Sequence, residues 1–245
     1  MVLTPGLMVR APMGGFSGFP NEPAGFTLVN EYGFSDVMPN PGAGDPVGSS
    51  GWFINNSGNI SRTSDGAAPQ SPSFVAQYSY PIGFPGGDDP GTLFLDVGGG
   101  NELYIGFYWK ASSPWQDHSA GNKITFQFLG GGGAGGQVFI MMTAGSHLLR
   151  PTTELASDNR NLDPNVNSTE ITLGSWHLIE WYMRKSPSSM KWWLDNVLQG
   201  NYTDVTWPAN AFDEHKIAPT WGGSGETKSE QDYFWYDHMR ISRHA

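Results

Sequence analysis

The sequence has no cysteine among its 245 residues, which excludes disulfides, a thiol nucleophile and cysteine-ligated zinc. Charged residues make up only 15% of the chain, and 13 Lys and Arg stand against 23 Asp and Glu. The net charge of -10 and the lack of any basic run argue against nucleic acid or an anionic membrane surface as a partner. A polyanionic ligand would be repelled unless a local basic groove overrides this field.

Long hydrophobic runs are also lacking. No stretch approaches the ~18 apolar residues of a membrane span, so no membrane insertion is expected. Residues 1–20 show no basic segment before an apolar one, and Pro5, Gly6 and Pro12 interrupt them, so no signal peptide is visible. The surface composition, with few Lys and many Asn, Ser, Gly and Trp, is typical of extracellular proteins. We therefore expect an extracellular or virion-surface location, reached after removal of a leader or inside an assembled particle.

Glycine, proline and aromatic residues are by contrast abundant, with 33 Gly, 18 Pro and 13% Phe, Trp and Tyr. This mixture disfavours long helices and favours many short strands joined by turns. Residues 1–25 are rich in Pro and Gly and are predicted to form an extended arm. Residues 26–245 contain no linker, charge block or convincing repeat, so they are predicted to form a single domain.

Apolar and polar residues alternate over several stretches, which is the pattern of half-buried strands. No stretch of 12 residues has a clean helical period. The predicted fold class is all-β, a two-sheet antiparallel β-sandwich. The strands are expected at residues 26–29, 73–80, 102–110, 123–129, 137–143, 176–184, 190–198 and 232–242.

Three segments in the last third of the chain resemble the concanavalin A-like lectin/glucanase superfamily, including its laminin G-like and polysaccharide-lyase branches. Residues 174–180 are similar to its element of a glycine, Trp-His and an apolar strand. Residues 191–200 are similar to its Asp-Gly hairpin, with Asn196 where Gly is usual, and Asn tolerates the left-handed conformation. Residues 236–244 are similar to its closing strand. The resemblance implies a jelly roll.

The resemblance also implies a glycan groove or active-site cleft on the concave face of one sheet. Outward side chains are then candidates, because aromatic rings stack on pyranoses while polar groups bind hydroxyls. In this interpretation Thr125 and Gln127 point outward, whereas Phe126 and Phe128 point inward. The alternative is that these positions form the wetter face of a sandwich, with aromatics in cross-strand pairs. The candidate ligand-binding residues are Tyr104, Tyr108, Lys110, Lys123, Gln127, Glu180, Tyr182, Arg184, Lys191 and Trp193.

Catalytic motifs of the superfamily are incomplete. A retaining glucanase needs Glu-x-Asp-x-x-Glu, and the nearest string, residues 230–232, has no second Glu. No predicted strand carries the Gln-x-His or the Arg-x-Glu-x-Arg motif of the alginate-lyase branch. A lyase would need a group that neutralises the substrate carboxylate, a base and an acid. His118 is expected at the groove edge and His215 at the surface. The set for a lyase would be Gln127, Tyr182, Arg184 and His118.

A structural Ca²⁺ is implied by the resemblance, because jelly rolls of this type often hold one between the first and last strands. Glu31 and Asp237 are placed to supply carboxylate oxygens. The alternative is that both are ordinary solvated carboxylates. No other cofactor is required, since the sequence has no His-x-x-x-His or Cys cluster.

The favoured function is a non-catalytic carbohydrate-binding, adhesion or surface-display module. It follows from the resemblance, the aromatic-rich outward positions and the incomplete catalytic motifs. A structural virion surface or decoration protein is the first alternative, with the arm contacting a scaffold or a second copy. A polysaccharide lyase is the second alternative, ahead of a glycoside hydrolase.

Overall fold

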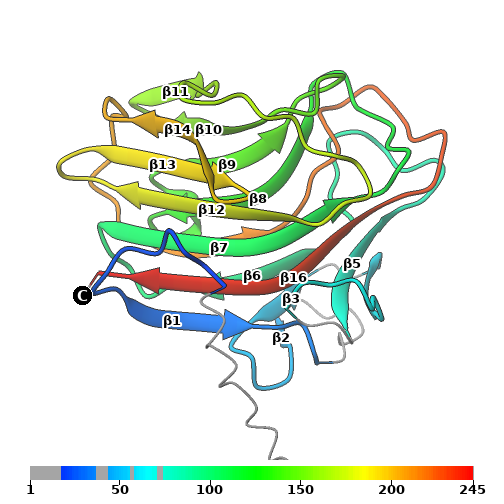
Figure 1. Cartoon of the computed structure of the whole chain (residues 1–245), viewed down its shortest axis with the longest axis horizontal. Coiled ribbons are helices and arrows are strands. Elements are labelled where there is room, and N and C mark those ends of the chain that lie inside the picture. Colours follow the sequence, from blue (N-terminus) through cyan, green and yellow to red (C-terminus); the bar gives the residue numbers. More distant parts are fainter. Residues whose placement is uncertain (1–17, 37–43, 56–57, 71–73, 245) are drawn as a thin grey trace, which may run out of the picture.

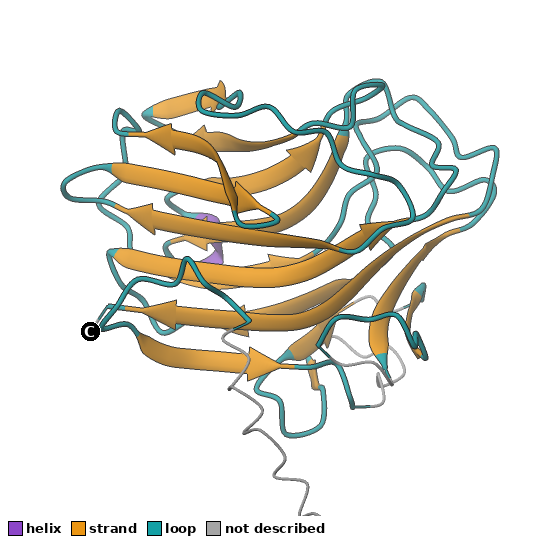
Figure 2. Cartoon of the chain, in the orientation of Figure 1, coloured by secondary structure: helices purple, strands orange, loops and turns teal. Residues whose placement is uncertain are grey.

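The chain forms an all-β sandwich of two antiparallel sheets, as the sequence predicted (Figure 2). The computed structural model describes residues 18–36, 44–55, 58–70 and 74–244. In these described parts of the chain, no helix has the length and apolar character needed to cross a membrane.

Sheet A carries most of the segments on which the resemblance was based. Its central strand β7 pairs with β12 on one side and with β16 on the other, so the last strand of the chain lies in the middle of the sheet (Figure 1). β1 and β5 both pair with β16, along successive parts of it. In spatial order the strands are β14 (Val197–Tyr202), β13 (Ser189–Leu194), β12 (His177–Arg184), β7 (Glu102–Ala111), β16 (Asp232–Arg243), β5 (Val75–Tyr80) and β4 (Ile60–Thr63), with β1 (Thr27–Tyr32) beside β16.

Sheet B packs against it. The glycine-rich joint between β8 and β9 forms the predicted hairpin, with a short 3-10 turn η1 (Gly131–Gly133) inside it. In spatial order the strands are β11 (Asp158–Asn161), β10 (Leu149–Leu155), β9 (Gln137–Met142), β8 (Asn122–Leu129), β15 (Phe212–Ile217), β6 (Thr92–Asp96), β3 (Phe53–Asn55) and β2 (Asp45–Pro46).

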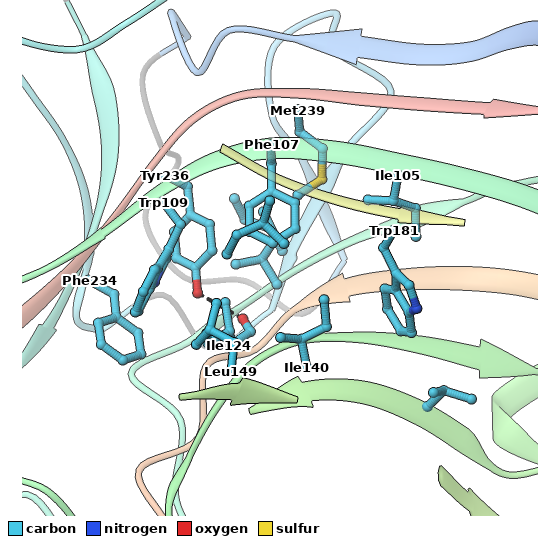
Figure 3. Close-up of a cluster of buried hydrophobic side chains, with 14 of the residues drawn as sticks. Ile105, Phe107, Trp109, Ile124, Ile140, Leu149, Trp181, Phe234, Tyr236 and Met239 are labelled. Carbon is cyan, nitrogen blue, oxygen red and sulfur yellow. Dashed lines mark hydrogen bonds between the residues drawn. The ribbon is translucent and has the colours of Figure 1, made fainter. Parts of the chain in front are cut away.

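The core lies between the two sheets (Figure 3). Trp109 and Trp181 project from sheet A toward Ile124 and Ile140 of sheet B, and all four are fully buried. The hydroxyl of the buried Tyr236 donates a 2.7 Å hydrogen bond to the main-chain oxygen of Ile124, so its polar end is satisfied inside the core. Alternation along each strand supplies these inward side chains, which is why the strand pattern was visible in the sequence.

A β-bulge in β8 changes which side chains face the core. Its register against β9 shifts between Lys123 and Thr125. An extra residue in one strand reverses the direction of every side chain that follows. Thr125 and Gln127 are therefore fully buried inside the sandwich. Phe126 packs instead in a separate cluster on the outer side of sheet B, with Phe128 against it. The prediction that Thr125 and Gln127 face outward, and Phe126 and Phe128 inward, is wrong.

Candidate functional site

The outer face of sheet A, pointing away from sheet B, brings together much of the predicted groove. Tyr182 lies opposite Tyr104 across the β7–β12 pair, and Glu180 lies opposite Trp193 across the β12–β13 pair. Alternation along these strands therefore correctly predicted that their outward side chains share one face of the sheet. Tyr108, Lys110, Arg184 and Lys191 lie along the same strands.

The chain itself covers the centre of this face. Residues 18–26, here called the strap, cross in front of β16 and β7 before β1 begins (Figure 1). Phe19 is 7% exposed and packs with Tyr104 and Tyr182. It can approach so closely because residue 106 is a glycine: a Cβ there would lie 2.3 Å from Cδ1 of Phe19. Residues 18–25 of the predicted arm thus lie on the sandwich, and residues 1–17 lie outside the described residues.

Glu180 anchors the strap. Its Oε1 accepts hydrogen bonds from the main-chain N–H of Asn21 at 2.8 Å and from the Tyr104 hydroxyl at 2.5 Å. Its Oε2 accepts from Nδ2 of Asn21 at 2.7 Å. Burial and the neighbouring Glu180 carboxylate raise the pKa of Tyr104, so its hydroxyl stays a donor. Glu180 and Tyr104 are fully buried, and the ligand-binding role predicted for them would require the strap to leave; it stays a prediction.

The four residues of the predicted lyase set do not meet. Gln127 lies inside the sandwich, where its Nε2 donates to the main-chain oxygen of Phe128 at 2.9 Å. Tyr182 is on the outer face of sheet A and donates to Glu102, which also lies 4.0 Å from the guanidinium of Arg184. His118 is 2% exposed and packs edge-on against Trp221 at 5.0 Å, so it does not sit at a groove edge.

The two residues predicted to bind calcium already have partners. Glu31 accepts from Nη1 of Arg240 and lies 2.8 Å from Nε2 of His238. Asp237 is buried, and its Oδ2 accepts from the main-chain N–H of Gln70 at 2.8 Å. A guanidinium beside Glu31 does not fit a cation site, because like charges repel. Within the described residues no three His, Cys, Asp or Glu side chains form a metal cluster. Calcium stays an untested prediction.

A groove of about 470 Å³ lies on the outer face of sheet B, and only one of the predicted ligand-binding residues, Lys123, lines it. This volume is typical of small-molecule sites. Three phenylalanines and two lysines from three neighbouring strands line it, together with two carboxylates and two amides. The residues lining this sheet B groove include Asp89, Phe94, Lys123, Phe126, Phe128, Gln137, Glu214 and Lys216.

Cation–π contacts hold the two lysine side chains of the groove against neighbouring phenylalanine rings. Nζ of Lys216 lies 4.2 Å from the ring centroid of Phe128 and 2.8 Å from Oε1 of Glu214. Nζ of Lys123 lies 4.7 Å from the ring of Phe139, and no carboxylate pairs with it among the residues described. Ring faces beside amine, carboxylate and amide groups are the combination that binds a pyranose, whose faces are apolar and whose rim carries hydroxyls.

His215 lies directly beneath this groove, on the inner side of β15. It is fully buried, so its expected surface position is wrong. Its Nε2 lies 2.9 Å from the hydroxyl of Thr125. Burial lowers the pKa of His215 to about 3. His177 behaves in the opposite way: burial lowers its pKa, but the hydrogen bond and charge of Asp195, 2.7 Å away, raise it overall.

These two histidines predict opposite pH dependences of stability. His215 is neutral in the folded protein and takes up a proton on unfolding below about pH 6.5, so it lowers stability as the pH falls toward 3, by about 1.4 kcal/mol per pH unit. His177 contributes stability below pH 6.5 that is lost as the pH rises through its raised pKa. Urea titrations from pH 7.5 to 5 measure the free energy of unfolding of the native protein and of each variant. On acidification, the advantage of the native protein over His215→Gln should shrink, and its advantage over His177→Gln should grow. Parallel curves for the native protein and His215→Gln would contradict the assignment.

The fold can be compared with known proteins. The sequence matches no protein-family model and no curated protein sequence. Among solved structures it is similar to the alginate lyase Aly36B, at 14% identity and a TM-score of 0.59 over 88% of this chain and 97% of that one. It is also similar to a carbohydrate esterase of the Shiga toxin-encoding bacteriophage phi24B, at 15% identity and a TM-score of 0.56 over 90% of this chain and 100% of that one.

A third similar structure is the cellulose-induced protein Cip1, at 14% identity and a TM-score of 0.54 over 78% of this chain and 90% of that one. At such identities the likeness concerns the fold alone. The predicted β-sandwich is thereby confirmed: this chain shares its fold with these solved structures.

Proposed function

We propose that this protein is a non-catalytic carbohydrate-binding module that holds a polysaccharide chain in the sheet B groove. The observation that carries the proposal is the aromatic floor of Phe94, Phe126 and Phe128 with Lys123 and Lys216 across it. The expected extracellular or virion-surface location suits such a module and is itself still a prediction.

The described lining of the groove contains carboxylates and lysines but no histidine and no tyrosine. A lyase needs a base and an acid near the sugar carbon, most often His or Tyr. Neither residue type lines the groove in the described part of the chain. His215 is close in sequence to Lys216 but points inward, and its low pKa keeps it neutral. Binding without turnover is therefore the function that this site supports best.

Glycoside hydrolysis is the second candidate, because two carboxylates line the same groove. Burial raises the pKa of Asp89, which is a property of a general acid. Glu214 could act as its partner, although it is ion-paired with Lys216. Release of reducing ends from a bound polysaccharide, abolished in Asp89→Asn, would favour this candidate over a binding module.

The test is calorimetric titration of the full chain with neutral and uronic-acid oligosaccharides. Phe128→Ala removes one stacking face and should weaken binding about tenfold or more, because burial of a Phe side chain contributes about 1.5–3 kcal/mol. Lys216→Ala should weaken it in the same direction. Phe74→Ala is the matched control, since Phe74 is exposed and packs against Arg62 away from this groove. Unchanged affinity in both groove variants would refute the proposal.

A further inference from the structure

The end of sheet A beyond the strap carries an aromatic cluster that the sheet B groove does not involve. Tyr233 and Trp235 alternate along β16 and so share its outer side. Their rings are stacked, with centroids 5.4 Å apart and planes at 23°. The strap lies over the other half of the strand, where Glu22 binds Arg240 at 2.7 Å. This pair of rings is therefore left uncovered by the strap.

Neighbouring polar groups fix the rings in place. Nε1 of Trp235 donates to Oε1 of Gln77 at 2.9 Å. Nζ of Lys110 lies 4.6 Å from the ring of Trp235 and 4.7 Å from the ring of Trp176. Asp65 binds Lys110 and also accepts from Nε1 of Trp176 at 3.2 Å. A surface ordered before binding loses less conformational entropy when a ligand arrives.

The charge at this cluster is balanced. The Asp65 carboxylate neutralises the Lys110 ammonium directly beside the rings. A hollow of about 370 Å³ adjoins them and is lined by Lys110, Ser112 and Gln231 as well as by Tyr233 and Trp235. Hydroxyl and amide groups are thus available around an aromatic surface without a net charge. This chemistry suits a neutral ligand with many hydroxyls better than an anion.

We propose that the Trp235 hollow is a second saccharide site, for a neutral pyranose chain, independent of the sheet B groove. Two stacked and partly exposed rings on alternate residues of one strand line the hollow and offer an aromatic surface against which the apolar face of a sugar ring can pack. Because the two sites lie on opposite sheets, one molecule could hold two separate chains. The single residue that this site shares with the predicted ligand-binding set is Lys110.

The proposal is tested with the full chain and three neutral probes: cellohexaose, mannohexaose and xylohexaose. At least one should bind saturably, and Trp235→Ala should weaken that binding about tenfold or more, as expected for loss of a stacking ring. Tyr233→Ala should act in the same direction and provides a second variant if Trp235→Ala does not fold. Phe128→Ala, in the sheet B groove, should leave binding at this site intact, so failure of one site does not imply failure of the other.

Two results would overturn the proposal. One is that the Phe128→Ala protein binds none of the three probes. In this variant the sheet B groove is altered and the Trp235 hollow is left intact. The other is equal affinity in the native protein, Trp235→Ala and Tyr233→Ala, with unchanged circular dichroism. Self-association that is abolished by Trp235→Ala, without sugar binding, would show instead that the Trp235 hollow is a contact between copies of this chain.

Discussion

Replacement of Lys228 by alanine is expected to lower the free energy of unfolding by about 3–5 kcal/mol, the loss typical of breaking a buried ion pair. The Lys228 side chain is fully buried, and its Nζ contacts Asp232 and donates to the main-chain oxygen of Gln116 at 2.8 Å. Burial lowers the pKa of Lys228. Its ammonium also lies 3.9 Å from the ring of Trp115 and 4.9 Å from that of Trp221.

The size of this effect comes from what the substitution leaves behind. Without the ammonium, the Asp232 carboxylate stays buried and keeps, among the residues described, the donors Ser112 and Gln116. Urea denaturation followed by tryptophan fluorescence measures the loss. Lys191→Ala is the matched control, because Lys191 is partly exposed on sheet A, and it should change stability by less than about 0.5 kcal/mol. A loss below about 1 kcal/mol for Lys228→Ala would contradict the buried pair.

Gly222→Ala is the second substitution expected to have a large effect, about 2–5 kcal/mol. Gly222 has a φ of 63°, where a Cβ costs roughly 1–2 kcal/mol. The added Cβ would also lie 1.8 Å from Cγ of His118, which is buried against Trp221 and has little room to move. Overpacking of this kind costs typically 1–3 kcal/mol.

Gly132→Ala separates these two contributions. Gly132 has a similar φ of 69°, but no heavy atom of the described residues, its two chain neighbours aside, lies within 4 Å of the position of its Cβ. The free energy of unfolding of Gly132→Ala should therefore fall by only about 1–2 kcal/mol, the cost of a Cβ at a positive φ. Equal losses of stability in Gly132→Ala and Gly222→Ala would show that His118 moves aside freely. That outcome would restore His118 as a side chain able to reach the surface.

The predicted groove on sheet A illustrates how far local patterns reach. Alternation has a period of two residues, so it correctly predicted that Tyr104, Glu180 and Tyr182 share one face. It carried no information about the strap, because Asn21 and Glu180 are 159 residues apart in the sequence. A Pro/Gly-rich segment shows a lack of regular structure, but not the surface on which it lies. The glycine at position 106 is the one local signal of a close approach from outside.

The sheet B groove escaped prediction for two other reasons. The bulge after Lys123 turns Phe126 and Phe128 to the outer face of sheet B. Alternation in the sequence shows that two sets of side chains lie on opposite faces of a strand, but it does not show which set faces the core. β15, with Glu214 and Lys216, has several charged residues in a short segment and no clear alternation. Its membership of the sheet comes from pairing with β6 and β8, which lie far away in the sequence.

The sequence by itself determined the all-β sandwich and the hairpin at Asp195 and Asn196, because alternation and turn residues act over a few neighbours. The expectation of a sugar-binding surface was implied by the family resemblance. Only the tertiary structure decided which face is open. The strap covers the centre of sheet A, and the β8 bulge exposes an aromatic floor on sheet B. Both outcomes depend on contacts between distant segments and on register, and a one-residue shift in register moves every later side chain to the other face.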